Sequence, residues 1–265
     1  MAVTSRSQIT RENTEFYDRT LLMRAVPLFI HTRWAQVRDI PRKGGTNVIK
    51  FRRYGNLTAA TTALTEGITP AGSSLSITDV SATVAQYGDF ITITDVIDYE
   101  SKDPVLMEAA EILGDQMGDT LDQLTRDVLA AGTVVQYGGN ATSRVTVDST
   151  DLIDGTEVKI AVRTLKNAKA RRITRMINAS TGIATEPVNA AYIGLVHPNT
   201  TYDLKGITGF TSVEKYASTM TVMEGEIGKI DEVRFVESPN TKVFTGAGAS
   251  SIDVYATIVF GSDAY

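Results

Sequence analysis

The feature that most constrains this chain is a long, chemically bland segment between two predicted strands. Residues 61–80 read TTALTEGITPAGSSLSITDV, with one acid, Glu66, before Asp79 and no base. Ordering a residue costs roughly 1–2 kcal/mol of backbone entropy, whereas each of the few apolar side chains returns only about 1.5–3 kcal/mol when buried. Because the segment cannot order itself, we expect it to lie on another subunit. The side chains expected at this inter-subunit contact are Leu64, Glu66, Ile68, Pro70, Leu75 and Ile77.

The segments on either side alternate as strands do. In Asn47–Leu57, Ile49 and Phe51 point one way while the basic residues between them point the other. Ser81–Asp95 alternates isoleucine with threonine near its end, and Gly88 marks a bulge or bend. The two strands and the segment between them form one long hairpin, each half of which reaches roughly 60 Å at about 3.3 Å per residue.

The strongest helix pattern runs over residues 103–132. Asp103 is a natural N-cap, Pro104 occupies the first helical position, and Gly132 follows the end. Some 28 residues give a rod of roughly 40 Å. Its apolar positions recur at spacings of three and four: Leu106, Ala110, Leu113, Met117, Leu121, Leu124 and Val128. The acids Asp115, Asp119 and Asp122 are expected on its solvent face.

The remaining elements predict an α+β fold. Residues 1–45 show little core pattern and resemble an arm. A helix is predicted over Thr156–Ala170, and a short helix follows a strand at Ala190–Pro198. Further strands are predicted over residues 232–238 and 251–261, without the regular alternation of a doubly wound fold.

Catalytic and metal chemistry have few candidate residues. The 265 residues include no cysteine and two histidines, so disulfides and thiolate metal sites are excluded and triads have few bases. We expect His31 to make a surface or partner contact and His197 to mark a strand-to-helix corner. The sequence predicts no enzyme, no cofactor, no metal site and no membrane span.

One basic strip stands out in a chain of net charge -5. Its seven members are Lys159, Arg163, Lys166, Lys169, Arg171, Arg172 and Arg175, with no acid between Val158 and Glu186. One interpretation is a solvated helix face whose cations lie near the negative end of the helix dipole. The other is non-specific contact with phosphates, in which each neutralised phosphate releases counterions. The absence of interleaved aromatic residues favours the first.

The order of several segments resembles the tailed-bacteriophage major capsid proteins of the HK97-type fold, over roughly residues 46–265. These segments are LTEGITP, YGDFITITD, DPVLMEAAEILGDQMGDTLDQLTRD, HPNTTYDL, GEIGKIDEVRFVES and VYATIVFGSDAY. The resemblance implies an N-terminal arm (1–45) and an extended hairpin loop (46–95). It also implies a peripheral domain (96–149 and 250–265, with the spine helix 103–132) and an axial domain (150–249).

The same resemblance implies a function and partners. The chain would assemble with itself into hexamers and pentamers of an icosahedral shell that encloses double-stranded DNA in a virion, formed in the host cytoplasm. Separate scaffolding and portal proteins, and in some cases decoration proteins, would take part. Some members crosslink a lysine of the extended loop to a neighbour, but residues 58–81 contain no lysine. We therefore expect a non-covalent shell.

Two alternatives remain open at this level. An encapsulin-like shell of the same fold would enclose a protein cargo, and the basic strip favours DNA only slightly. A monomeric enzyme or binding module would use residues 58–80 as a mobile lid, but it would need a polar catalytic cluster that the sequence does not show.

Overall fold

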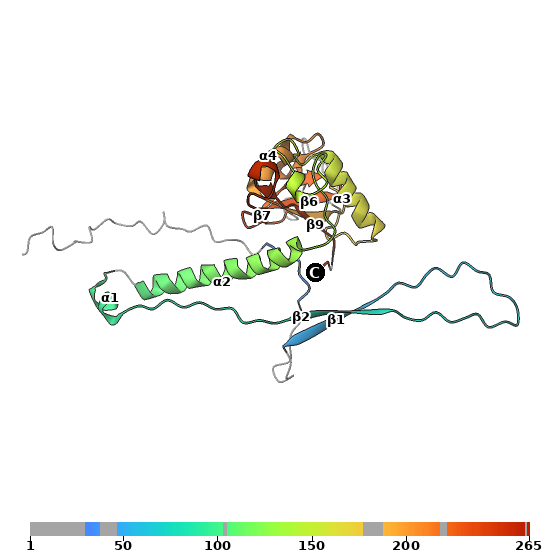
Figure 1. The fold of residues 1–265 in the computed structure, drawn as a ribbon, viewed down its shortest axis with the longest axis horizontal. Coiled ribbons are helices and arrows are strands. Elements are labelled where there is room, and N and C mark those ends of the chain that lie inside the picture. The colour runs from blue at the N-terminus through green and yellow to red at the C-terminus, as the bar shows by residue number, and fades with distance from the viewer. Residues whose placement is uncertain (1–29, 38–46, 103–104, 177–187, 218–221, 263) are drawn as a thin grey trace, which may run out of the picture. The chain divides into compact units, whose positions relative to one another are not determined.

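The computed structural model describes residues 30–37, 47–102, 105–176, 188–217, 222–262 and 264–265. The chain divides into two compact units, one of Met1–Gln36 with Ile93–Tyr265 and the other of Val37–Thr92. Helices and sheets in separate stretches confirm the predicted α+β class (Figure 1). Most of the predicted arm lies outside the described residues. Among the residues that are described, no helix is long and apolar enough to cross a membrane.

The smaller unit is an antiparallel ribbon with a long connecting loop (Figure 1). β1 (Val48–Tyr54) pairs with β2 (Ile77–Thr83) over seven residues each. The pairing extends into the loop by one hydrogen bond, in which the Gly55 amide donates to the Ser76 carbonyl at 2.9 Å. This ribbon confirms the predicted hairpin and the predicted first strand.

The second strand of the ribbon lies earlier in the chain than the sequence predicts. Of the predicted range Ser81–Asp95, only the first three residues belong to β2, and residues 84–94 form neither helix nor strand. Gly88 therefore marks no strand bulge. The alternation of isoleucine and threonine there is a strand pattern, but a strand also needs a partner for its backbone groups, and none of the described strands lies beside it.

The predicted long helix is confirmed as α2 (Val105–Ala130), which at 1.5 Å per residue is about 39 Å long. The predicted cap residues Asp103 and Pro104 lie outside the described residues. At the other end, the Gly132 amide donates to the Leu129 carbonyl at 3.1 Å. A short helix, α1 (Asp95–Glu100), precedes α2.

The larger unit is built on a five-stranded sheet of order β4-β5-β6-β3-β9. β3 and β6 run parallel, and the other neighbours are antiparallel. The predicted strands at 190–198 and 232–238 are confirmed as β3 and β6. The bounds are β3 (Tyr192–Val196), β4 (Thr211–Ser212), β5 (Glu226–Ile230), β6 (Val233–Glu237) and β9 (Ile258–Phe260).

Alternate residues of β3 enter two hydrophobic cores, because successive side chains of a strand point to opposite faces. Tyr192 and Val196 join the first core, and Ile193 and Leu195 join the second. The other buried members of the first core are Val158, Val162, Leu204, Ile230, Val233 and Phe235. Those of the second are Ile30, Val236 and Phe260.

Two helices follow capping signals that the sequence shows. α3 (Gly155–Asn167) begins with a capping box in which Asp154 and Glu157 satisfy each other's backbone amides, and it confirms the predicted second helix. α4 (Pro198–Gly206) begins directly after β3, and the Nδ1 atom of His197 accepts a hydrogen bond from the Asn199 amide at 3.1 Å. His197 is therefore the strand-to-helix corner that the sequence predicts.

The predicted strand over residues 251–261 is split between two sheets. β8 (Val254–Tyr255) pairs with β7 (Val243–Phe244), whereas β9 pairs with β3 in the main sheet. The predicted peripheral segment 250–265 thus shares a sheet with the predicted axial domain. The described 3-10 turns are η1 (Arg144–Thr146), η2 (Val213–Lys215) and η4 (Ala249–Ser251).

Candidate assembly and nucleic-acid contact surfaces

The loop of the hairpin exposes the apolar side chains that the sequence assigns to a contact. Leu64, Ile68, Leu75 and Ile77 are all more than half exposed. The tip is a tight turn in which the Ile68 amide donates to the Thr65 carbonyl at 3.2 Å, with Gly67 at φ 80. Glu66 and Pro70 are exposed as well, and Ile77 is the first residue of β2 rather than a loop residue.

Both faces of the ribbon of the hairpin carry apolar and polar side chains. The register places Phe51 opposite Val80 on one face and Arg52 opposite Asp79 on the other. Arg52 Nε donates to Asp79 Oδ1 at 3.2 Å, and both side chains are exposed, so this pair stabilises the ribbon by less than about 1 kcal/mol. Every residue from Arg52 to Thr92 is exposed. The described part of the hairpin unit therefore has no buried core of its own.

Exposed apolar side chains continue beyond the ribbon, in a region that the sequence analysis did not assign to a contact. The alternation within residues 81–95 predicts a strand, so the sequence pattern alone does not identify the apolar side chains there as exposed. The exposed members are Val84, Tyr87, Phe90, Ile91, Val96, Ile97 and Tyr99.

Three of the predicted apolar positions of the long helix α2 form an outward stripe, which the sequence does not predict, whereas Leu113 and Leu124 are half-buried. Met117 is 66% exposed, Leu121 40% and Val128 74%. Asp122, expected on the solvent face, is buried and 1% exposed. The correction has a physical reason: Asp122 has a buried partner, and a carboxylate can be buried when it is paired and hydrogen-bonded.

The partner of Asp122 is His31, which is also buried and is not the surface residue that the sequence predicts. Asp122 Oδ1 accepts the His31 backbone amide at 2.7 Å, and Oδ2 lies 2.8 Å from His31 Nδ1. Burial raises the pKa of the Asp122 carboxyl, but hydrogen bonds and charge from His31 outweigh burial and leave this pKa below its ordinary value. Tyr265 donates its hydroxyl to the His31 carbonyl at 2.7 Å.

A second polar contact of α2 involves Asp119, which the sequence also placed in solvent. Asn240 Nδ2 donates to Asp119 Oδ1 at 2.7 Å, and Arg126 donates to the Asn240 carbonyl at 3.1 Å. Asp127 lies 3.0 Å from Lys242 Nζ. Polar side chains of α2 therefore join the helix to the rest of its unit, while Met117, Leu121 and Val128 of the outward stripe stay exposed.

The basic strip is exposed along its whole length, on α3 and the segment that follows it. Two members are paired with Glu232, at the turn between β5 and β6. Lys166 Nζ lies 2.6 Å from Glu232 Oε1, and Arg172 donates two hydrogen bonds to Oε2, at 3.0 and 2.6 Å. Burial raises the pKa of the Glu232 carboxyl, but the hydrogen bonds and charges of Lys166 and Arg172 outweigh burial and leave this pKa below its ordinary value.

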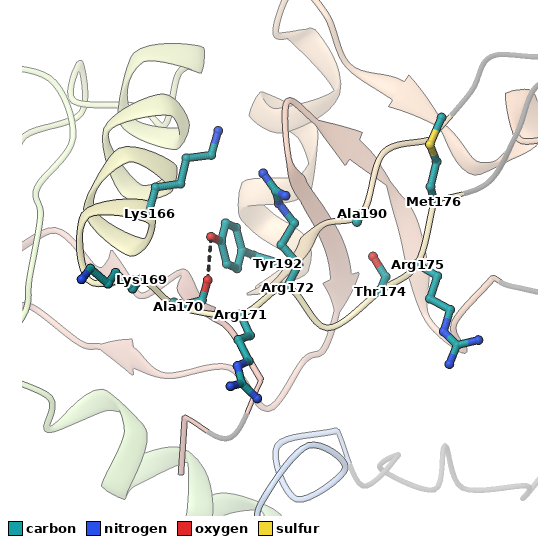
Figure 2. A pocket seen from close by; sticks show the side chains of 10 residues that line it. All are labelled: Lys166, Lys169, Ala170, Arg171, Arg172, Thr174, Arg175, Met176, Ala190 and Tyr192. Atoms are coloured by element: carbon teal, nitrogen blue, oxygen red, sulfur yellow. Dashed lines mark hydrogen bonds between the residues drawn. The ribbon is translucent and has the colours of Figure 1, made fainter. Parts of the chain in front are cut away.

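Five of the seven strip residues, all except Lys159 and Arg163, line an open depression of about 580 Å³ (Figure 2). Its floor includes Tyr192, whose hydroxyl donates to the Ala170 carbonyl at 3.2 Å. Figure 2 shows the side chains of Arg171 and Arg175 pointing away from those of Lys166 and Arg172. The five strip cations other than Lys166 and Arg172 have no ion pair with the residues that the structure describes: Lys159, Arg163, Lys169, Arg171 and Arg175.

A second buried charge cluster among the described residues joins β5 to β6. Arg234 and Glu226 form a bidentate pair with contacts of 2.6 and 2.5 Å, and Tyr216 donates to Glu226 Oε1 at 3.0 Å. Burial, followed by the charge of Glu226, raises the pKa of the Tyr216 hydroxyl. No described His, Cys, Asp or Glu residues gather in threes that could hold a metal ion.

Comparisons with known proteins agree with the resemblance seen in the sequence. A family model described as phage capsid protein matches residues 77–263. The major capsid protein of Pseudomonas phage KPP21 is 31% identical over 171 residues, which are 62% of this chain and 43% of that protein. The chain thus spans less than half the length of this curated relative.

Two solved structures share the fold. The capsid of Ralstonia phage GP4 matches with a TM-score of 0.68 and 14% identity, over 100% of this chain and 83% of that one. The capsid of cyanophage P-SCSP1u matches with a TM-score of 0.61 and 14% identity, over 98% and 80%. The described fold is therefore an α+β capsid fold, and the chain belongs to the phage capsid protein family.

Proposed function

We propose that this chain is a major capsid protein that assembles with itself, without covalent links, into hexamers and pentamers of an icosahedral shell of the HK97 type. The shell encloses double-stranded DNA, and the chain resides in the virion after assembly in the host cytoplasm. Separate scaffolding and portal proteins take part, with decoration proteins in some shells. The arm, the hairpin loop, a peripheral domain with α2 and an axial domain are its parts.

The observation that carries this proposal is the hairpin unit, whose residues from Arg52 to Thr92 are all exposed. A lone two-stranded ribbon is at best marginally stable in water. Each large apolar side chain that it exposes would gain about 1.5–3 kcal/mol on burial. A second copy of the chain supplies that burial in a shell. Leu64 and Ile68 lie at the turn that forms the loop tip, and Leu75 lies next to the paired strands.

The basic strip supports DNA as the content. Its exposed cations can neutralise backbone phosphates without reading bases, which suits packaging of DNA of any sequence. A protein cargo, as in an encapsulin-like shell, gives these cations no such role. For a lid-bearing enzyme, the described residues include no group of three His, Cys, Asp or Glu that could hold a metal ion.

The experiment shortens the hairpin without disturbing its strands. Residues 57–75 are replaced by one glycine, so that Asn56 and this glycine close a two-residue turn between the hydrogen-bonded Gly55 and Ser76. The shortened chain is expected to fold but to form no shells in electron micrographs. As a control, residues 58–73 are replaced by a Gly/Ser segment of equal length. Shells formed by the shortened chain would refute the role of the hairpin. If the unaltered protein remains monomeric, the proposed shell is refuted.

A further inference from the structure

The basic strip is divided by Glu232 into two sets of cations that cannot act alike. Lys166 and Arg172 share this one carboxylate, whose side chain is 18% exposed, and they join the end of α3 to the turn between β5 and β6. The single carboxylate cancels one of the two positive charges and holds both side chains by hydrogen bonds, so this pair gains less from phosphates than two unpaired cations do. These two cations therefore brace the fold.

Three of the five unpaired cations lie in the segment after α3, and the other two, Lys159 and Arg163, lie on α3 itself. Lys169, Arg171 and Arg175 are exposed and have no acid within ion-pair distance among the described residues. The main chain of this segment is fixed, because the Arg171 carbonyl accepts the Ser262 amide at 2.9 Å and the Ile173 amide donates to the Ala191 carbonyl at 3.1 Å. Fixed backbone with free cationic side chains is suited to binding phosphates at small entropic cost.

The backbone conformation at Lys169 favours glycine over lysine. It ends α3 in a Schellman motif, in which the Ala170 amide donates to the Leu165 carbonyl at 3.0 Å and the Lys169 amide to the Lys166 carbonyl at 2.9 Å. Its φ of 56 lies in the left-handed region where glycine is preferred. A lysine at this position places a cation beside Arg171 at the expense of backbone strain.

We propose that Lys169, Arg171 and Arg175 form the site that binds the phosphate backbone of DNA, and that Glu232 withholds Lys166 and Arg172 from it. This inference rests on the proposed function, since it assumes that the strip faces DNA. It goes beyond that function by assigning contact to one set of cations and bracing to the other.

The test measures binding of the full-length, unassembled chain to a mixed-sequence DNA duplex between 50 and 200 mM salt. Each phosphate contact contributes about 0.9 to the slope of log affinity against log salt. Arg171→Gln/Arg175→Gln is expected to lower the slope by about two without changing the melting temperature. Lys166→Gln/Arg172→Gln is expected to lower the slope by at most about one and to lower the melting temperature. Lys205→Gln/Lys215→Gln removes the same charge from exposed positions outside the strip and should change neither.

A further variant separates lost contact from misfolding. Lys169→Gly is expected to lower the slope by about one while raising the melting temperature, because glycine relieves the positive φ.

Equal slopes for the Arg171/Arg175 and Lys166/Arg172 variants would overturn the division. If the parent binds DNA but only the Lys205/Lys215 variant weakens it, the strip is not the site. If the parent does not bind at all, the DNA contact fails together with the inference. Lost shell assembly with unchanged DNA binding in the Arg171/Arg175 variant would show that a second copy, and not DNA, contacts these arginines.

Discussion

At the residue scale, Gly194 is the position where the core leaves no room for a side chain. A Cβ atom there would lie 2.8 Å from the Phe235 ring and 3.0 Å from a Val233 methyl. Overpacking of a core typically costs about 1–3 kcal/mol, so Gly194→Ala is expected to lower the free energy of unfolding by that amount in urea denaturation. Gly114 on α2 has nothing within 4 Å, and Gly114→Ala should instead stabilise by up to about 1 kcal/mol. Equal losses at both positions would contradict this explanation.

The buried pair of Asp122 and His31 predicts a pH dependence of stability. The pKa of Asp122 is lowered in the folded chain. A group with a depressed folded pKa contributes stability above its unfolded pKa, about 3.9 for aspartate, and this contribution is lost as the pH falls through the folded pKa. At neutral pH, Asp122→Ala is expected to lower the free energy of unfolding by about 3–5 kcal/mol, because it leaves His31 buried without its partner.

The measurement is chemical denaturation of parent and variant at several values between pH 6 and pH 3. The gap between the two curves should narrow below about pH 4. Asp115→Asn on the same helix serves as the control, since the structure shows no ion pair for Asp115 among the described residues. A gap that stays constant down to pH 3 would mean that Asp122 contributes through packing alone.

At the element scale, α2 shows what periodicity can and cannot predict. Spacings of three and four, with Gly132 after the last turn, predict the helix, because both are local properties of the chain; the predicted caps Asp103 and Pro104 lie outside the described residues. These local properties do not predict which side of α2 faces the rest of its unit. That side is set by contacts with His31 and Asn240, which lie 91 and 121 residues away from their partners on α2. The same limit applies to Glu232, which lies 66 residues from Lys166. Composition identifies the cations of the strip, but only the fold shows which of them are neutralised.

The outward stripe of α2 leads to a prediction about assembly. Met117 and Leu121 are exposed, and exposed substitutions usually change stability by less than about 0.5 kcal/mol. Met117→Gln/Leu121→Gln should therefore leave the urea midpoint of the unassembled chain unchanged while reducing the yield of shells in sedimentation. Val145→Gln, at an exposed apolar position outside α2, is the matched control. A lower midpoint with normal assembly would show that the stripe packs within its own chain.

At the scale of the whole molecule, the exposed hairpin and the outward stripe of α2 indicate that a single chain leaves its apolar burial unfinished. Fold class, the long helix and the paired strands follow from local patterns. The final burial does not, because under the proposed function it depends on a second copy of the chain, whose surface no single segment of the sequence shows. The flanking region of residues 84–94 illustrates this, since its strand-like alternation has no partner among the described strands.

The contacts that complete this burial are predicted to be non-covalent. An isopeptide crosslink needs a lysine amine, and residues 51–101, which include the whole loop, contain none. The lysine before this range, Lys50, lies in β1 within the paired strands rather than at the loop tip. Purified shells boiled in detergent are therefore expected to migrate as one band of 28.6 kDa, and unheated shells treated with denaturant should release single chains in sedimentation. A ladder of multiples on the denaturing gel would contradict the prediction, and its loss in Lys50→Arg would identify the base of the ribbon as the link.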